Sequence, residues 1–391
     1  MRIAIFSDTY PPQINGVATS TYNLVNTLKA HGHDVLLVTV NRTDTKFNFS
    51  EGVVEIPGIL LKRIYGYRLA PIYHGKAMRV IRDWNPEIIH NQTDAAVGQF
   101  AKIVARHLKI PIVYTYHTQY EDYTYYVTKG NFDRIARNVI QYYSRMVAKG
   151  STGFITPSVK TKEMMRMYGS DVHISVIPTG IDFSLFEENK IDKKEVDEFK
   201  KEHGIKENTL VFLILGRLAN EKSMDVSINY YAGFLKKHPE IDTKMFIVGG
   251  GPARNSLELL THELKIADKV EFIGPVPASR VPFFYYLADV YTSASITETQ
   301  GLTFMEAMAS RTLVLARYDD NLTGVIEDNE TGFFFTSEDT FIEKVERIIA
   351  SNQEEKERIH ENALKIIEKY SIQTFYENVM EVYLRCVKKY W

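Results

Sequence analysis

Short apolar runs rich in β-branched residues alternate with amphipathic helical patterns along most of this chain, and the alternation occurs twice in succession. Such runs are typical of strands that are buried on both faces of a sheet. In the first series the expected strands are RIAIFS (2–7), DVLLVTV (34–40), EIIHNQ (87–92), IPIVYTYH (110–117), STGFITPS (151–158) and HISVIPTGID (173–182). In the second series they are TLVFLILGR (209–217), TKMFIVGGG (243–251), KVEFIGPV (269–276), DVYTSAS (289–295) and TLVLARY (312–318).

Strands that alternate with helices predict a parallel sheet covered by helices on both faces, so two series predict two doubly wound α/β domains. A length of 391 residues is also long for one hydrophobic core. We place the first domain at 1–180, the second at 181–374 and a final amphipathic helix at 375–391. Because ligands bind at the carboxyl ends of the strands in such sheets, the loops that follow the strands should carry the chemistry.

Composition excludes several classes of protein. The single cysteine, Cys386, cannot form an intrachain disulfide, which favours a reducing compartment. No apolar run approaches the roughly 20 residues that span a bilayer, and the apolar stretch at the N-terminus is too short for a signal peptide. We therefore expect a cytoplasmic protein. A net charge of −2 gives no general attraction for nucleic acid or anionic lipid.

Two of the loops carry groups that suit phosphate. In SDTYPPQINGVATS, Gly16 lies just before a helix start, where free backbone N–H groups and the helix dipole favour an anion. Arg217 and Lys222 follow the first strand of the second series, and two cations there suit a diphosphate. The alternative is a connector shaped by its prolines and glycine, together with ordinary solvated charges.

The run VGGGPAR resembles a dinucleotide-binding fingerprint that lacks its third glycine. Gly249 and Gly251 match the first two glycines, Arg254 occupies the third position, and Glu271 lies near where a ribose-binding acid would stand. Arg254 would obstruct the close packing that the third glycine permits. We interpret Gly249 as part of a tight strand-to-helix turn beside a ligand, with an NAD-dependent oxidoreductase as the remote alternative.

Three further residues, at or after the ends of expected strands, are candidates for ligand binding. His117 ends an apolar strand; a histidine beside aromatic residues is more often structural, but its strand-end position favours a site. ITETQGLTFMEAM (296–308) places Glu298 in a loop and Glu306 on the following helix, where two carboxylates and free first-turn amides could bind the hydroxyls and diphosphate of a sugar nucleotide. Complementing the helix dipole would explain Glu306 but not Glu298.

Together these segments resemble the retaining glycosyltransferases of family 4. ETQGLTFMEAMAS has the Glu-x7-Glu spacing of that family, GRLANEKS matches its Arg and Lys diphosphate motif, and INGVATS and IPTGID fall in the expected places. HTQYEDYTYY and ARYDDNLTGVI resemble, more narrowly, bacterial 1,2-diacylglycerol 3-glucosyltransferases (monoglucosyldiacylglycerol synthases). The resemblance covers nearly the whole chain. It implies the GT-B fold, two Rossmann-like domains facing across a deep cleft, with residues 375–391 crossing back to the first domain.

The resemblance also implies roles for individual residues. Glu306 would hold the ribose hydroxyls, Glu298 would contact the donor sugar, and His117 would lie beside the reacting sugar. The implied catalytic residues are His117, Glu298, Arg217 and Lys222. The implied donor-binding residues are Gly16, Arg217, Lys222, Gly249, Val276 along the base, Glu298, the amides of Gly301 and Leu302, and Glu306.

Two positions depart from the family pattern, and one motif is missing. Arg311 stands where the family usually has glycine, and Leu313 stands in place of a proline. The sequence therefore does not fix the backbone conformation of the turn after the helix. No Asp-x-Asp metal motif is present. We therefore expect no metal ligands and no tightly bound cofactor, with UDP-glucose as the donor substrate and Mg²⁺ at most a stimulant without a dedicated site.

Two basic stretches suggest contact with a membrane. Residues 62–82 contain six basic residues, no acidic residue and three tyrosines, and 129–150 form a second basic cluster. Solvated helix faces would explain both, but an acceptor in a bilayer requires the enzyme to reach an anionic surface. The expected membrane-binding residues are Lys62, Arg63, Arg68, Lys76, Arg79, Arg82, Arg134 and Arg137.

The resulting hypothesis is a peripheral enzyme at the cytoplasmic face of the cell membrane that transfers glucose from UDP-glucose to the 3-hydroxyl of 1,2-diacylglycerol with retention of configuration. The alternatives are a member of the same family that uses another nucleotide sugar, or another acceptor such as phosphatidylinositol, a glycosylated lipid or a soluble sugar. The sequence does not distinguish glucose from galactose, and it leaves the oligomeric state open.

Overall fold

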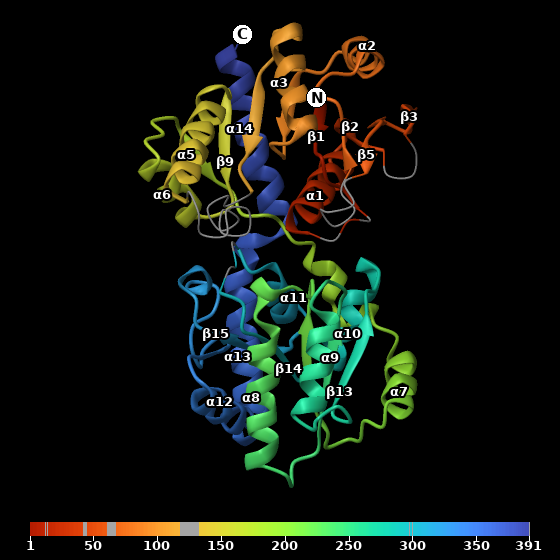
Figure 1. The fold of residues 1–391 in the computed structure, drawn as a ribbon, viewed down its shortest axis with the longest axis vertical. Coiled ribbons are helices and arrows are strands. Elements are labelled where there is room, and N and C mark those ends of the chain that lie inside the picture. Colours follow the sequence, from red (N-terminus) through yellow and green to blue (C-terminus); the bar gives the residue numbers. More distant parts are fainter. Residues whose placement is uncertain are drawn as a thin grey trace. The chain divides into compact units, whose positions relative to one another are not determined.

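The structure is a computed structural model that describes residues 1–11, 13, 15–41, 45–60, 68–117, 133–296, 298 and 300–390, with the backbone alone for 133–137. The chain divides into two compact units: unit 1 comprises 1–180 and 372–391, and unit 2 comprises 181–371. In Figure 1 the last helix, in blue, belongs with the red-to-yellow elements of unit 1.

The described residues of unit 1 form an eight-stranded sheet with the order β10-β9-β8-β7-β1-β2-β4-β3. Its pairs are parallel except β3 with β4. The strands are β1 (Arg2–Phe6), β2 (Asp34–Val40), β3 (Asn48–Ser50), β4 (Val53–Ile56), β7 (Ile88–Asn91), β8 (Ile112–Thr115), β9 (Gly153–Thr156) and β10 (Ile174–Val176). A separate antiparallel pair comprises β5 (Ile59–Leu60) and β6 (Arg68–Leu69).

Helices cover both faces of this sheet (Figure 1). The helices are α1 (Gly16–Ala30), α2 (Gly75–Trp84), α3 (Ala96–Leu108), α5 (Asp133–Lys149), α6 (Val159–Met167) and α14 (Ile372–Tyr390). Alternate residues of β1 enter different cores: Ile3 and Ile5 pack with α1 and α14, whereas Ala4 and Phe6 pack with α2 and α3. This period-two burial on both sides explains why β1 is apolar throughout.

Unit 2 contains a six-stranded parallel sheet with the order β13-β12-β11-β14-β15-β16. The strands are β11 (Leu210–Leu215), β12 (Thr243–Val248), β13 (Val270–Gly274), β14 (Val290–Ser293), β15 (Leu313–Arg317) and β16 (Phe333–Phe335). The helices are α7 (Lys193–Glu202), α8 (Met224–Lys237), α9 (Arg254–Glu263), α10 (Val281–Leu287), α11 (Leu302–Ala309), α12 (Glu338–Ala350) and α13 (Gln353–Ile367). Again the central strand divides its side chains between two cores, with Val211 and Leu213 on one face and Phe212 and Ile214 on the other.

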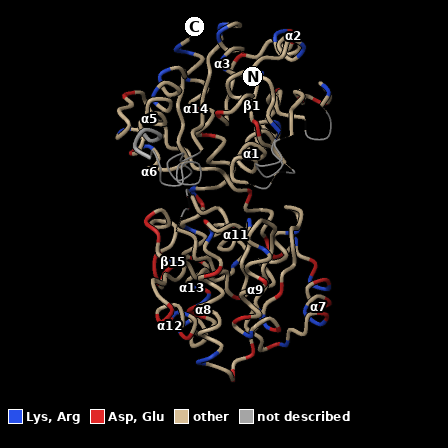
Figure 2. Tube along the Cα trace, viewed as in Figure 1, with Lys and Arg blue, Asp and Glu red and all other residues tan. Residues whose placement is uncertain are grey.

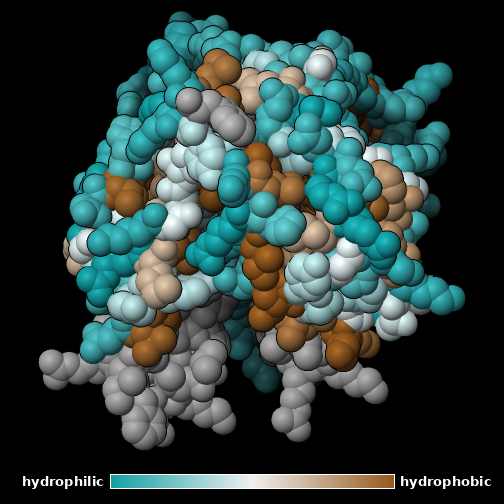
Figure 3. Space-filling model, turned by 90° about the horizontal axis from the view of Figure 1, so that it is seen from above, coloured by the Kyte–Doolittle hydropathy of each residue, from teal (hydrophilic) through white to brown (hydrophobic). Residues whose placement is uncertain are grey.

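Charge and hydropathy vary over the surface of both units. Figure 2 shows basic residues along α2 and interspersed acidic and basic residues along α7. On the face drawn in Figure 3, separate apolar areas interrupt a mostly hydrophilic surface. Across the described parts of the chain, none of the helices has both the length and the apolar composition to cross a bilayer.

A buried hydrogen-bond pair fixes α14 to the sheet of unit 1. The side chain of His90, in β7, is almost fully buried, and its Nδ1 lies 2.6 Å from the hydroxyl of Tyr383 in α14. Its other ring nitrogen, Nε2, lies 2.7 Å from the hydroxyl of Thr115 in β8. Burial lowers the pKa of His90 to about 3, so the ring is neutral and uses one nitrogen as a donor and the other as an acceptor.

We expect Tyr383→Phe to lower the free energy of unfolding by about 1–3 kcal/mol, because one buried ring nitrogen of His90 would lose its partner. Urea unfolding at neutral pH measures the effect. The matched control is Tyr376→Phe in the same helix, whose hydroxyl contacts Nε2 of His33 at 2.9 Å at a partly exposed site that water can reach. Equal losses for the two variants would contradict a special contribution from the buried pair.

Candidate functional site

In unit 2 the direction of strand addition reverses between β11 and β14. β12 and β13 lie on one side of this pair, and β15 and β16 lie on the other. Ligands of open parallel sheets bind outside the carboxyl ends of the strands at such a switch point. The segments that follow β11 and β14 carry Arg217, Lys222, Glu298, Gly301, Leu302 and Glu306, all expected from the sequence to bind the donor.

Lys222 and Glu298 contact each other across this switch point. The ammonium nitrogen of Lys222 donates to Oε1 of Glu298 at 2.7 Å, and the two side chains are 30% and 12% exposed. The contact joins the loop after β11 to the loop after β14. Because both groups are largely withdrawn from water, their attraction is screened less than that of a surface pair.

The second predicted cation is also paired. The guanidinium of Arg217 forms an ion pair with the carboxylate of Glu221, four residues further along the same loop. Each cation at the switch point therefore faces a carboxylate. A diphosphate bound there would compete with Glu221 for Arg217 and with Glu298 for Lys222.

Glu306 lies on α11 and is hydrogen-bonded to a buried tyrosine. The Tyr285 hydroxyl lies 3.1 Å from Oε2 of Glu306 and 3.0 Å from the backbone carbonyl of Thr303. Burial raises the pKa of Glu306 from 4.5 to about 7, although the Tyr285 hydrogen bond opposes the shift. A carboxylate that has lost most of its water would gain from neutral hydrogen-bond donors such as ligand hydroxyls.

The start of α11 requires glycine at position 301. Gly301 has φ 72°, and a Cβ atom there would lie 2.6 Å from Cδ2 of Leu322. The helix begins at Leu302, and the N–H groups of a first turn have no carbonyl partner within the helix. The amides at Gly301 and Leu302 therefore lie where donors for an anion were expected.

Gly249 is required by packing between two strand-end loops. Its φ is 139°, and an added Cβ would lie 1.8 Å from the carbonyl oxygen of Gly216. The loop after β12 thus packs directly on the segment that holds Arg217, which explains this glycine without a dinucleotide. Val276 follows β13 and is partly buried against the same core as β14.

Arg311 keeps the turn that glycine would make at the end of α11. It adopts a left-handed conformation with φ 60°, which costs a non-glycine residue about 1–2 kcal/mol. Its backbone N–H donates to the carbonyl of Met308 at 3.0 Å, and its guanidinium pairs with Glu357 on α13. The departure from the family pattern therefore changes the side chain at this turn and retains a left-handed backbone.

In unit 1 the strand order reverses between β7 and β1. Gly16 is the first residue of α1, whose N-cap Asn15 accepts a hydrogen bond from the Ala18 amide at 2.8 Å. A Cβ added to Gly16 would meet no described atom within 4 Å, so the backbone at this helix start is open to a ligand. Gly16 follows β1 and therefore lies beside the switch point of its sheet, and its role in binding a phosphate stays a prediction.

His117 follows β8, and its Nε2 lies 2.7 Å from Oε1 of Gln92, the first residue after β7. Burial lowers the pKa of His117 to about 4. Gln92 is not among the residues that the sequence pattern predicted to bind the substrate. The rule that selected His117, a polar residue directly after a buried strand, applies equally to Gln92 and would have found it.

Comparisons with known proteins find glycosyltransferases for both halves of the chain. A family model described as Glycosyltransferase Family 4 matches residues 14–185, and one described as Glycosyl transferases group 1 matches 195–366. An alpha-monoglucosyldiacylglycerol synthase of Streptococcus pneumoniae is 33% identical over 388 residues, covering 99% of this chain and 86% of that protein. The chain belongs to the family 4 glycosyltransferases.

A second relative and a solved structure extend the comparison. The alpha-monoglucosyldiacylglycerol synthase of Acholeplasma laidlawii is 31% identical over 395 residues, covering 100% of this glycosyltransferase and 98% of that protein. The crystal structure of Anabaena HepE in complex with UDP-glucose has a TM-score of 0.74 and 15% identity, covering 98% and 100% of the two chains. The expected GT-B class, with two Rossmann-like domains, is confirmed. The remote oxidoreductase alternative was wrong.

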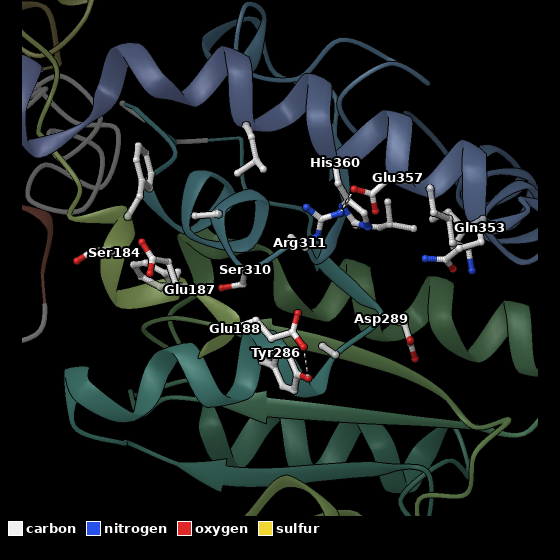
Figure 4. A pocket seen from close by; sticks show the side chains of 18 residues that line it. Ser184, Glu187, Glu188, Tyr286, Asp289, Ser310, Arg311, Gln353, Glu357 and His360 are labelled. Atoms are coloured by element: carbon white, nitrogen blue, oxygen red, sulfur yellow. Dashed lines mark hydrogen bonds and ion pairs between the residues drawn. The ribbon is translucent and has the colours of Figure 1, made fainter. Parts of the chain in front are cut away.

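The glycosyltransferase also has a cavity of about 620 Å³ in unit 2, drawn in Figure 4. Its lining includes Glu188, Tyr286, Ser310 and Arg311, and it contains none of the residues assigned to the donor. Figure 4 shows the Arg311 side chain beside Glu357, and both residues line this cavity. The cavity and the switch point therefore share none of these residues.

The expected membrane-binding residues are only partly within the described chain. Lys76, Arg79 and Arg82 are exposed on α2, whereas Arg68 is partly buried in β6 and donates to the carbonyl of Gly58 at 3.1 Å. Of the remaining four, Lys62 and Arg63 lie outside the described residues. Arg134 and Arg137 lie on α5, where the structure describes their backbone but not their side chains. No group of three or more His, Cys, Asp or Glu side chains in the described ranges is arranged to hold a metal ion.

The raised pKa of Glu306 predicts how the stability of the glycosyltransferase depends on pH. Between about pH 4.5 and 7 the folded protein keeps a proton that the unfolded chain has released, so the free energy of unfolding falls as pH rises through this window. Glu306→Gln removes this dependence. We expect the variant to gain on the order of 1–3 kcal/mol over the wild type between pH 5 and 8, measured by urea unfolding. Parallel stability curves for the two proteins would contradict the shift.

Proposed function

We propose that this glycosyltransferase transfers glucose from UDP-glucose to the 3-hydroxyl of 1,2-diacylglycerol, with retention of configuration, to give monoglucosyldiacylglycerol and UDP. The observation that carries the proposal is the similarity over the whole chain to two proteins named alpha-monoglucosyldiacylglycerol synthase, at 33% and 31% identity. The local geometry of each unit supports it further.

The switch point of unit 2 supports a nucleotide sugar as donor. Arg217 and Lys222 are the cations that would bind the diphosphate, helped by the amides at the start of α11. Glu306 would accept hydrogen bonds from the ribose hydroxyls, and Glu298 from the transferred sugar. The structural neighbour HepE was solved with UDP-glucose, a donor of this kind.

The same residues would act in the transfer step. As the bond between the anomeric carbon and the diphosphate lengthens, positive charge develops on the sugar and negative charge on the leaving group. Arg217, Lys222 and the α11 amides would stabilise the leaving diphosphate, and preorganised donors of this kind contribute a few kcal/mol each. The lipid hydroxyl would attack from the face that the diphosphate leaves, giving its proton to a leaving phosphate oxygen, so configuration is retained.

The β5–β6 pair and α2 support a lipid acceptor reached from a membrane surface. Ile59 is 77% exposed, and Ile72, between this pair and α2, is 56% exposed. On α2 the buried side is Ala77, Met78 and Ile81, and the exposed side carries Lys76, Arg79 and Arg82. Exposed apolar residues close in sequence to a basic helix face suit binding to an anionic bilayer. The apolar residues would be buried in the lipid, and the cations would be attracted to its surface.

Helix α5 presents a second apolar face. Val139, Tyr142 and Met146 are 61%, 60% and 54% exposed, and their spacing places them on one side of the helix. The guanidinium of Arg145 lies 5.9 Å from the centre of the Tyr142 ring. Aromatic and aliphatic residues exposed beside cations are typical of helices that lie in a membrane interface. These features support a peripheral membrane protein, and we propose that it acts at the cytoplasmic face.

The function is tested by incubating the purified full chain with vesicles of diacylglycerol and anionic phospholipid and with labelled UDP-glucose, UDP-galactose or GDP-mannose. We expect a single product, monoglucosyldiacylglycerol with an α-glucosidic bond at the 3-position, formed from UDP-glucose. Lys222→Ala should lower kcat roughly 100-fold or more, because it removes one cation from the leaving group. Thin-layer chromatography, mass spectrometry and NMR of the product provide the measurement.

The control is Lys237→Ala, which removes a mostly exposed ion pair with Glu346 and should leave kcat unchanged. Transfer from another nucleotide sugar, or to phosphatidylinositol, a glycosylated lipid or a soluble sugar instead of diacylglycerol, would overturn the proposed substrates while leaving the family unchanged.

Membrane attachment makes a separate prediction. Replacing Lys76, Arg79 and Arg82 with glutamine should weaken binding to anionic vesicles roughly 10- to 100-fold, because each cation near such a surface contributes about 1 kcal/mol. Co-sedimentation at physiological salt measures binding. The matched control replaces three exposed lysines of unit 2, Lys194, Lys201 and Lys236, with glutamine. Equal binding by both triple variants would contradict attachment through α2.

A further inference from the structure

Two histidines of unit 1 lie on neighbouring strands or strand ends, and their ring nitrogens are bonded differently. Both ring nitrogens of His90 have hydroxyl partners, at 2.6 and 2.7 Å. His117 is partly exposed, and within the described chain only its Nε2 has a side-chain partner, Oε1 of Gln92 at 2.7 Å. His90 is satisfied by the protein itself, whereas His117 retains one ring nitrogen for another molecule.

The contact with Gln92 determines which nitrogen that is. A carboxamide oxygen can only accept a hydrogen bond, so Nε2 of His117 must carry the proton. Burial lowers the pKa of His117 to about 4, so the ring is neutral at physiological pH. A neutral ring with its proton on Nε2 has an unprotonated Nδ1, which is a hydrogen-bond acceptor.

Gln92 has a second group without a partner. Gln92 is 3% exposed, and its amide nitrogen, Nε2, is buried and has no hydrogen-bond partner among the residues that the structure describes. Buried amide donors are rarely left unbonded in native proteins. An unbonded donor next to a histidine with a free acceptor points to a ligand group that can both give and receive a hydrogen bond.

We propose that Gln92 is a positioning residue that holds His117 in the Nε2–H tautomer, so that Nδ1 accepts a hydrogen bond from a substrate hydroxyl whose oxygen accepts one from the Gln92 amide. The inference rests on the proposed function, in which the substrate at this edge of the sheet is a hexose. A hydroxyl is the group that matches this pair, because it is donor and acceptor at once. A carbonyl or phosphate oxygen could use only the Gln92 amide.

The tautomer is measured directly on the full chain with selectively ¹⁵N-labelled histidine, without any substrate. The His117 signals, assigned by their loss in His117→Ala, should show a protonated Nε2 and an unprotonated Nδ1 from pH 6 to 8. Gln92→Leu should abolish this fixed pattern and give mixed tautomers. Gln99→Leu is the matched control, because Gln99 hydrogen-bonds the Tyr143 hydroxyl at 2.6 Å and does not contact His117. A proton on Nδ1 in the wild type would overturn the assignment, since the carboxamide would then be turned with its nitrogen toward the ring.

Kinetics test the contact with the substrate. Gln92→Leu should lower kcat/KM for the glycosyl donor roughly 10- to 100-fold, the loss expected for one or two hydrogen bonds. Gln92→Glu places a carboxylate beside His117 and should raise its pKa, because a nearby negative charge favours imidazolium. The described titratable group that interacts with this ring is His90, which is itself neutral. The Glu variant should therefore lose activity as pH falls from 8 to 6, while the wild type shows no such loss from His117.

The two measurements separate the possible failures. If the tautomer is confirmed and the enzyme uses another sugar or acceptor, the proposed substrate is wrong and the role of Gln92 stands. If the tautomer is confirmed but Gln92→Leu keeps full kcat/KM with the true substrate, the hydroxyl contact is overturned. A pH profile of Gln92→Glu that matches the wild type would also overturn it.

Discussion

Parallel strands that share hydrogen bonds deliver all their carboxyl ends to one edge of a sheet, and this constraint positions the candidate substrate-binding residues in the loops that follow the strands. Within each unit, the reversal of strand order leaves two adjacent loops diverging at that edge, between β11 and β14 in unit 2 and between β1 and β7 in unit 1. The buried strands supply the rigidity, because their side chains fill a core on each face. The loops can then carry polar groups without destabilising the sheet.

The polar groups at these edges are held in different ways. In unit 2, the charged side chains form two ion pairs, Lys222 with Glu298 and Arg217 with Glu221. A diphosphate bound here would have to displace carboxylates from these cations, so a ligand with high negative charge and additional hydrogen-bonding groups would be favoured. In unit 1, the Gln92–His117 pair is neutral, which suits it to a sugar hydroxyl more than to a phosphate. Within its own unit, the edge of unit 2 therefore favours an anionic ligand and the edge of unit 1 favours a neutral hydroxyl.

The sequence predicted the elements whose burial pattern is strong and missed those whose pattern is weak. The long apolar runs gave β1, β2, β11 and β12 because both faces of these strands are covered. β5 and β6 were missed because they have two residues each, and β16, Phe333–Phe335, because three residues carry too little periodicity. Lys222 and Glu298 were selected because they are charged residues in loops that follow strands. Their contact could not be predicted, because 76 positions separate them and only the strand order brings them together.

The packing of α14 has a consequence for synthesis on the ribosome. Phe375, Val379, Val382 and Tyr383 complete the core on one face of the sheet in unit 1, while residues 181–371 form unit 2 on their own. A nascent chain that has emerged only as far as residue 180 still exposes that apolar face. Unit 2 is contiguous in sequence and can fold before α14 is synthesised. Residues 1–180 can complete their core only after α14 has emerged. During that interval their uncovered leucines and isoleucines are the part of the protein most in need of a chaperone.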